Sequence, residues 1–80
     1  MLATQNYRDR IKALREDADM TQDDVAKILG TSQTMCSHYE TGKVELPVRH
    51  LIELCKRYQV SADYILGFTN DPNPANLKYK

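Results

Sequence analysis

The stretch Thr21-Gln-Asp-Asp-Val-Ala-Lys-Ile-Leu-Gly-Thr-Ser-Gln33 has the pattern of one short helix, a tight turn and the start of a second helix. The hydroxyl of Thr21 can cap the first helix, and the carboxylates that follow it face the free amides at the positive end of the helix dipole. Gly30 can take the left-handed conformation that ends a helix, and Ser32 can cap the next one. The sequence therefore predicts helices over residues 22–29 and 33–41.

Three more helices are predicted around this pair from the spacing of apolar residues. Upstream, apolar side chains recur on one stripe over about Gln5–Asp17. Downstream, a second stripe opens on a proline that suits a first helical turn and predicts a helix over about Pro47–Gln59. Ser61 and Gly67 bracket a last short helix over residues 62–66. Strand-type alternation is absent from the sequence, so the predicted fold class is all-α, with five helices.

Length and composition limit the function further. A chain of 80 residues has room for one domain and not for a multidomain enzyme. Lys and Arg together number 11, as do Asp and Glu, so no overall basic field indicates nucleic acid. We expect a domain over residues 5–67 and, because proline and turn-forming residues follow, a tail over 68–80 for dimerisation or partner contact. The sequence shows no signal-peptide or membrane-length apolar run, so a cytoplasmic protein without membrane contact is expected.

The second helix of the central pair separates polar from apolar side chains. On a helical wheel, Cys36, Tyr39 and Glu40 share one side, which we expect to face the core. A tight turn containing glycine sets such a helix at a steep angle to its neighbour, so that it can project into the DNA major groove, about 12 Å wide. Amides and hydroxyls suit the edges of bases, and the outward side carries, after Gln33 at its tip, Thr34, Ser37, His38 and Thr41.

Two charged residues are predicted to point into the core. Arg15 follows Ile11 by four positions, and Glu40 follows Cys36 by four positions, so each continues an inward-facing stripe. A single buried charge is costly. We therefore predict that Arg15 and Glu40 pair with each other and lock their two helices together.

Four segments of the chain form a joint pattern: Arg10-Ile-Lys-Ala-Leu-Arg-Glu, Met20-Thr-Gln-Asp-Asp-Val-Ala-Lys-Ile-Leu-Gly-Thr-Ser, Ser37-His-Tyr-Glu-Thr-Gly-Lys and Ser61-Ala-Asp-Tyr-Ile-Leu-Gly. This pattern resembles the XRE or Cro-type helix-turn-helix family of phage and bacterial repressors. The resemblance covers residues 7–67 and implies a lambda-repressor-like domain that binds double-stranded DNA.

The resemblance also implies roles for individual residues. Gln22 would touch a DNA phosphate and brace Gln33, whose amide can bond adenine through two atoms. Lys43 would meet backbone phosphate, and Arg15 and Glu40 match a buried pair of the family. The residues implied to face the major groove are Ser32, Gln33, Thr34, Ser37 and His38.

The chain departs from the family pattern in two places. Cys36 stands where Ile or Val is usual, and the loop Val44-Glu45-Leu46 lacks the basic residues that some relatives place on the DNA backbone. Between Met20 and Lys43 the net charge is −1. Phosphate would therefore be held by helix N-termini and neutral side chains.

Other functions are weighed against DNA binding. A thiol hydrolase would need Cys36 beside a base, but on a helix Cys36 and His38 point about 200° apart. The two cysteines and two histidines lack the paired spacing of a metal site, so we expect no metal, no cofactor and no enzyme. The main alternative is an antitoxin, or another protein-interaction module on the same fold, with a toxin or other protein as its partner.

The sequence thus favours a transcriptional repressor that acts as a homodimer on a palindromic operator. Two recognition helices would read half-sites about 34 Å apart. The dimer contact is expected where the last helix ends, with Ile65 and Phe68 as exposed candidates.

Overall fold

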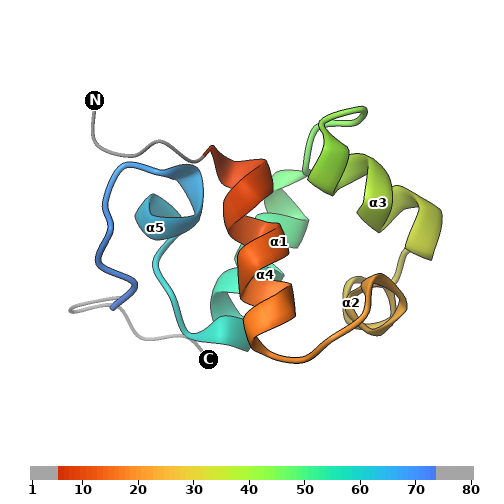
Figure 1. Cartoon of the computed structure of the whole chain (residues 1–80), viewed down its shortest axis with the longest axis horizontal. Helices are drawn as coiled ribbons and strands as arrows, with labels where there is room; N and C mark the ends of the chain where they lie inside the picture. The colour runs from red at the N-terminus through yellow and green to blue at the C-terminus, as the bar shows by residue number, and fades with distance from the viewer. Residues whose placement is uncertain (1–5, 74–80) are drawn as a thin grey trace.

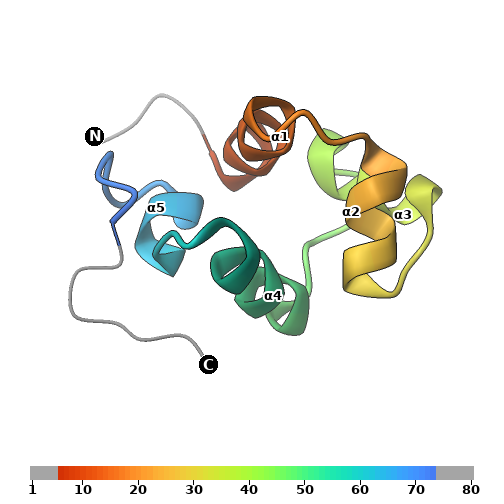
Figure 2. The same ribbon diagram turned by 90° about the horizontal axis from the view of Figure 1, so that it is seen from below.

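The computed structural model describes residues 6–73, and this part of the chain is all-α, as predicted (Figure 1). α2 and α3 lie at one end of the molecule and α5 at the other, with α1 and α4 between them (Figures 1 and 2). No helix within residues 6–73 is long and apolar enough to cross a membrane. The helices are α1 (Tyr7–Asp17), α2 (Gln22–Leu29), α3 (Gln33–Thr41), α4 (Val48–Tyr58) and α5 (Ala62–Leu66).

The helices begin within two residues of the predicted positions, and the capping residues Asn6 and Pro47 explain the differences. α1 begins at Tyr7 because the side-chain oxygen of Asn6 accepts hydrogen bonds from the amides of Arg8 and Asp9, at 3.0 and 3.2 Å. Pro47 has an extended backbone (ψ 148°), so it is the N-cap of α4 and not part of its first turn. The hydroxyl caps predicted for the other three helices are confirmed: Thr21, Ser32 and Ser61.

Every helix contributes buried side chains to one apolar core. Burial of each large apolar side chain contributes about 1.5–3 kcal/mol, so the inward faces of short helices are stabilised mainly by this packing. The buried cluster consists of Ile11, Val25, Ala26, Cys36, Tyr39, Leu54, Cys55, Val60 and Ile65.

The prediction that Ile65 contributes to an exposed dimer contact is wrong. Ile65 is 0% exposed and lies in the core, so it cannot form an exposed contact patch. α5 has five residues, and three consecutive apolar side chains end it, so apolar spacing does not indicate which of them turns inward. Phe68, just after α5, is 63% exposed and remains a candidate.

The first part of the predicted tail is bound to the helices. The Ser61 amide donates a hydrogen bond to the Pro72 carbonyl at 3.1 Å, and Arg10 Nη2 donates to Asn70 Oδ1 at 3.3 Å. We call these two contacts the C-terminal clasp. The division predicted at residue 67 therefore falls before a segment that contacts the domain, and residues 74–80 lie outside the described residues.

Arg10 takes part in the clasp from a buried position. Its guanidinium carbon lies 4.0 Å from the centre of the Tyr64 ring, which attracts a cation through its electron-rich face. Within residues 6–73 its Nε has no hydrogen-bond acceptor. Because a buried cation needs partners, Asn70 and the Tyr64 ring both stabilise the place of Arg10.

His50 of α4 is a buried imidazole. It is 4% exposed, and its ring meets the Tyr39 ring edge-on, with centroids 5.8 Å apart. Burial lowers the pKa of His50 below its ordinary value because the charged form would lose its hydration. The neighbouring Arg49 lowers this pKa further, and Glu53 opposes the shift.

The lowered pKa of His50 predicts a pH-dependent stability. The unfolded chain takes up a proton on its imidazole near pH ~6.5, whereas the folded chain resists protonation until a lower pH. We therefore expect the free energy of unfolding to decrease as the pH falls below about 6.5. Thermal melts at a series of pH values measure it. His50→Leu should flatten this dependence; the same slope in His50→Leu and the wild type would contradict the assignment.

Candidate nucleic-acid interface

A three-residue turn sets α3 at a steep angle to α2. In Figure 1 α2 is seen nearly end-on while α3 runs across the view. Gly30 ends α2 with φ +71°, and a Cβ placed there would meet no atom within 4 Å, so backbone conformation alone requires glycine. Two residues later, Ser32 Oγ accepts the Met35 amide at 3.1 Å and starts α3. The geometry leaves one face of α3 turned outward.

The two faces of α3 differ as the helical wheel predicts. Cys36 and Tyr39 are buried in the core, whereas Gln33, Thr34 and Thr41 are exposed and Ser37 and His38 are half-buried. Ser32, at the cap, is exposed as well. The outward surface is thus built from amides, hydroxyls and one imidazole, groups that can both donate and accept hydrogen bonds.

The core behind α3 has a small void next to Cys36. The cavity measures about 10 Å³, and Cys36, Leu29 and Tyr58 are among its lining residues. Burial raises the pKa of the Cys36 thiol, which disfavours the reactive thiolate. Cys36 therefore acts as a small apolar side chain that leaves its site slightly underfilled.

The predicted ion pair between Arg15 and Glu40 is confirmed. Arg15 Nε donates to Glu40 Oε2 at 2.8 Å and Nη2 donates to Oε1 at 3.1 Å, a two-pronged contact between side chains only 13% and 8% exposed. Arg15 Nη1 also donates to the Met20 carbonyl at 2.8 Å. The hydrogen bond to Glu40 raises the pKa of Arg15 above its ordinary value. The pair fixes α3 against α1 and the start of α2.

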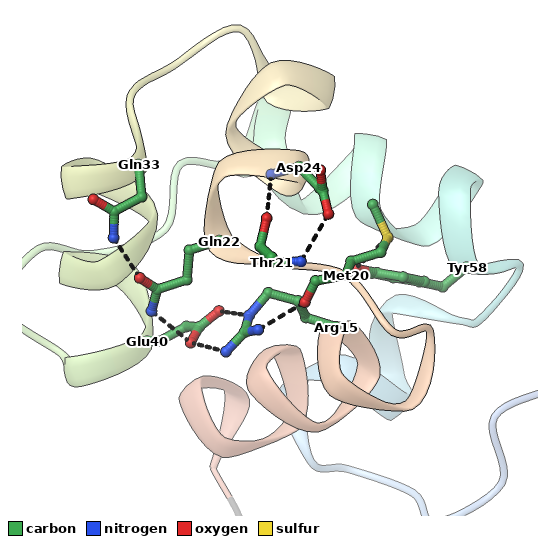
Figure 3. Close-up of polar contacts among 8 residues, drawn as sticks. All are labelled: Arg15, Met20, Thr21, Gln22, Asp24, Gln33, Glu40 and Tyr58. Atoms are coloured by element: carbon green, nitrogen blue, oxygen red, sulfur yellow. Dashed lines mark hydrogen bonds and ion pairs between the residues drawn. The ribbon is translucent and has the colours of Figure 1, made fainter.

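Gln22 connects this ion pair to the tip of α3. Gln33 Nε2 donates to Gln22 Oε1 at 2.6 Å, which places Gln22 in the bracing position that the resemblance implied. Gln22 Nε2 in turn donates to Glu40 Oε1 at 3.1 Å. We call the four side chains Arg15, Glu40, Gln22 and Gln33 the amide relay (Figure 3).

The link from Gln22 to Glu40 was not predicted from the sequence. One signal was present: Gln33 and Glu40 are seven residues apart, two helical turns, so they lie along the same side of α3. A side chain from α2 that reaches Gln33 therefore passes near Glu40.

Lys43 is exposed two residues after α3, and sequence reasoning missed an arginine, Arg8, that lies at the same end of α3. A Cβ on Gly42 would lie 2.6–2.9 Å from side-chain atoms of Arg8, so that side chain crosses the end of α3. Arg8 also forms an ion pair with Glu45 at 3.7 Å. A Cβ at position 42 would make the flexible Arg8 side chain shift, and the φ of +85° is what favours glycine there.

The structure offers little for metal or nucleophilic chemistry. Within residues 6–73, no group of three or more His, Cys, Asp or Glu side chains is placed to hold a metal ion. Cys36 is buried on the inner face of α3, and His38 belongs to the outer face. The surface is suited to hydrogen bonding with a polar partner.

A family model described as helix-turn-helix matches residues 11–65, which includes α2, the turn and α3. The chain belongs to the helix-turn-helix family. This match and the relatives below confirm the resemblance to XRE-type regulators. The matched residues include all four side chains of the amide relay and the outward face of α3.

Two curated relatives are similar to most of this chain. One is YobD of Bacillus subtilis, an uncharacterized HTH-type transcriptional regulator, 35% identical over 68 residues that make up 85% of this chain and 61% of YobD. The other is the antitoxin PezA of Streptococcus pneumoniae serotype 4, 34% identical over 64 residues, 80% of this chain and 40% of PezA. The chain thus spans less than two thirds of the length of either relative.

Two solved structures show the same fold. The P22 c2 repressor, determined in complex with a synthetic operator, superposes with a TM-score of 0.71 at 33% identity, over 79% of this chain and 96% of that one. The DNA-binding domain of the P22 c2 repressor in solution gives a TM-score of 0.71 at 32% identity, over 82% and 87%. The fold is that of a repressor-type DNA-binding domain.

Removal of Glu40 should strongly destabilise the domain. Glu40→Ala leaves the Arg15 guanidinium buried without its partner, which we expect to cost about 3 kcal/mol in the free energy of unfolding. Urea or thermal unfolding measures it. As a control, Asp23→Ala removes the exposed ion pair with Lys27 and should change stability by less than about 0.5 kcal/mol. Similar losses in both variants would show that the buried pair contributes no more than a surface pair.

Proposed function

We propose that this protein is a transcriptional repressor that binds a specific sequence of double-stranded DNA and reads the major groove with α3. The observation that carries the proposal is the outward face of α3, whose first residue, Gln33, is held in a fixed orientation by Gln22. The likeness to the P22 c2 repressor, which was determined on an operator, supports it. Regulation of transcription agrees with the likeness to YobD.

The proposed contacts follow from where each side chain lies. Gln33 and Thr34 stand at the exposed start of α3, where recognition helices meet base edges. Ser37 and His38 lie one turn further on, and Ser32 precedes the helix. Gln22 and Lys43, on either side of α3, are suited to DNA phosphates, with Gln22 at the positive N-terminus of α2.

The absence of a strong basic charge shapes this proposal. The whole chain is formally neutral, so few cations are displaced from DNA on binding. Affinity would come from backbone amides, hydroxyls and amide side chains, which position the protein on phosphate without net charge. We therefore expect a shallow salt dependence, on the order of four or fewer ions per subunit.

The active form of the repressor is proposed to be a homodimer on a palindromic operator. A single small module buries too little surface for tight specific binding, whereas two modules read two half-sites. Exposed apolar side chains of α4, of α5 and of the residues just after α5 are candidates for the contact: Val48, Ile52, Leu66 and Phe68. The proposal includes a cytoplasmic location, no cofactor and no catalytic activity.

One observation favours a second function. PezA, an antitoxin, is 34% identical to this chain, so an antitoxin that binds a protein partner is the alternative. In that case, the exposed apolar side chains around Phe68 would contact the partner instead of a second copy.

Selection from random duplex DNA tests the proposed function. The purified chain should enrich a palindromic sequence with half-sites about 34 Å apart, and binding to it should weaken only slightly as salt rises. A folded, helical protein that enriches no sequence would overturn the repressor proposal and favour the antitoxin alternative.

Two substitutions separate base reading from phosphate binding. Gln33→Ala should lose about 1–3 kcal/mol of discrimination at one base position, because both hydrogen bonds to that base disappear. Lys43→Ala should weaken binding to selected and random DNA by the same factor, because phosphate carries no sequence. Competition binding measures both; equal losses on the two DNAs for Gln33→Ala would remove Gln33 from the reading surface.

A substitution at Phe68 tests the dimer. Phe68→Ser should weaken self-association and lower affinity for the full palindrome while leaving affinity for one half-site unchanged. Sedimentation and binding to both duplexes measure these effects. Thr69→Ser, next along the chain, is a matched control, and a monomeric wild type that binds one half-site as tightly as two would contradict the dimer.

A further inference from the structure

The amide relay has only one consistent order of donors and acceptors. The Arg15 guanidinium can only donate hydrogen bonds, and the Glu40 carboxylate can only accept them (Figure 3). The buried ion pair therefore decides which group donates in each of the next hydrogen bonds of the relay. Gln22 must then turn its NH2 group toward Glu40, at 3.1 Å, and its carbonyl toward Gln33. That carbonyl can only accept, so Gln33 turns its own NH2 group inward, at 2.6 Å.

This order decides which atoms Gln33 presents to the solvent. Its Oε1 and the second N–H of its Nε2 remain unused by the relay. In the major groove adenine offers an acceptor at N7 and a donor at N6, whereas guanine offers two acceptors, N7 and O6. One carbonyl together with one N–H complements both groups of adenine, whereas on guanine the carbonyl would face O6, a second acceptor.

A glutamine outside such a relay would not make this distinction. The terminal amide torsion is broad and nearly two-fold, so a free amide turns over at little cost and exposes its NH2 group equally well. With NH2 outward, the side chain complements the acceptors of guanine. The choice between the two bases therefore depends on what holds the inner end of the amide.

We propose that Glu40, although buried and out of reach of DNA, determines base preference by fixing the amide orientation of Gln33 through Gln22. Glu40 is a positioning residue, and the two-pronged contact with Arg15 holds it in place. This inference rests on the proposed function, because it assigns the base that Gln33 selects. It predicts that the protein prefers adenine to guanine at the base position where Gln33→Ala weakens discrimination.

The test compares two duplexes that differ at that one position, A·T or G·C, within the selected site. The wild type should prefer A·T by at least about fivefold. Glu40→Gln places an NH2 group where a carboxylate oxygen was, which allows Gln22 and then Gln33 to turn over. The preference for A·T should disappear or reverse, although no residue at the DNA surface has changed.

Two further variants keep the test decisive if Glu40→Gln unfolds. Arg15→Met combined with Glu40→Gln removes both buried charges and leaves none unpaired, which proteins tolerate well. Gln22→Leu interrupts the relay and leaves the ion pair intact. In both, the preference for A·T should fall to about twofold or less, whatever the loss in overall affinity. Glu53→Ala, at an exposed position of α4 outside both the relay and the proposed DNA contacts, is the control and should keep the wild-type preference.

The free protein offers a readout that needs no DNA. In the NMR spectrum, one side-chain amide proton of Gln33 should be shifted downfield and exchange slowly with water, and Gln22→Leu should abolish both effects. A Gln33 amide that does not respond to Gln22→Leu would overturn the relay.

The outcomes separate this inference from the proposed function. If the wild type selects a site and all three variants keep its preference at the Gln33 position, the inference is wrong and the repressor proposal stands. If the wild type selects no site, the proposed function fails, and the base assignment falls with it.

Discussion

The ion pair between Arg15 and Glu40 joins α1 to the last turn of α3, and the outward face of α3 depends on it. α3 has nine residues, too few for a stable helix in isolation, and its buried residues are Cys36 and Tyr39. Apolar packing of these two side chains is non-directional, so it does not by itself specify the rotation of the helix. The two-pronged contact with Arg15 fixes both the rotation and the height of α3 on the core.

The proposed reading surface combines a charged interior with a neutral exterior. Full charges are held where water is scarce, and the outer side chains carry only dipoles. Such an arrangement favours discrimination over general affinity, because dipoles are directional and phosphate attraction is not. Under the proposed function, the acidic first turn of α2, with Asp23 and Asp24, would also oppose indiscriminate attachment to DNA.

Much of this architecture was predictable because it is specified locally. Helix caps such as Thr21 and Ser32 are decided by residues within three positions, and the inward charges on α1 and α3 followed from helical periodicity. Ile65 was misplaced because α5 is shorter than two turns, so nothing local distinguishes its buried side chain from Leu66. The contacts of Arg10 with Asn70, and of Gln22 with Glu40, join residues distant in sequence and depend on how the helices pack.

The DNA contacts of individual residues could be inferred from the sequence only through the family resemblance. Composition gave no indication of them, since the chain is neutral. Gln33 and Thr34 are exposed at the start of α3, which burial patterns alone would also give to any polar position. The orientation of the Gln33 amide was beyond sequence reasoning, because it is set through Gln22 of α2 by the ion pair between Glu40 and Arg15.

The C-terminal clasp has a practical consequence for chimeric regulators. A fusion that exchanges this module at the end of α5, where the helices end, would remove Asn70 and leave the guanidinium of Arg10 buried with fewer partners. The Ser61 amide would lose its acceptor at the same time. The smallest portable unit of this fold therefore extends through residue 73, and a linker belongs after it.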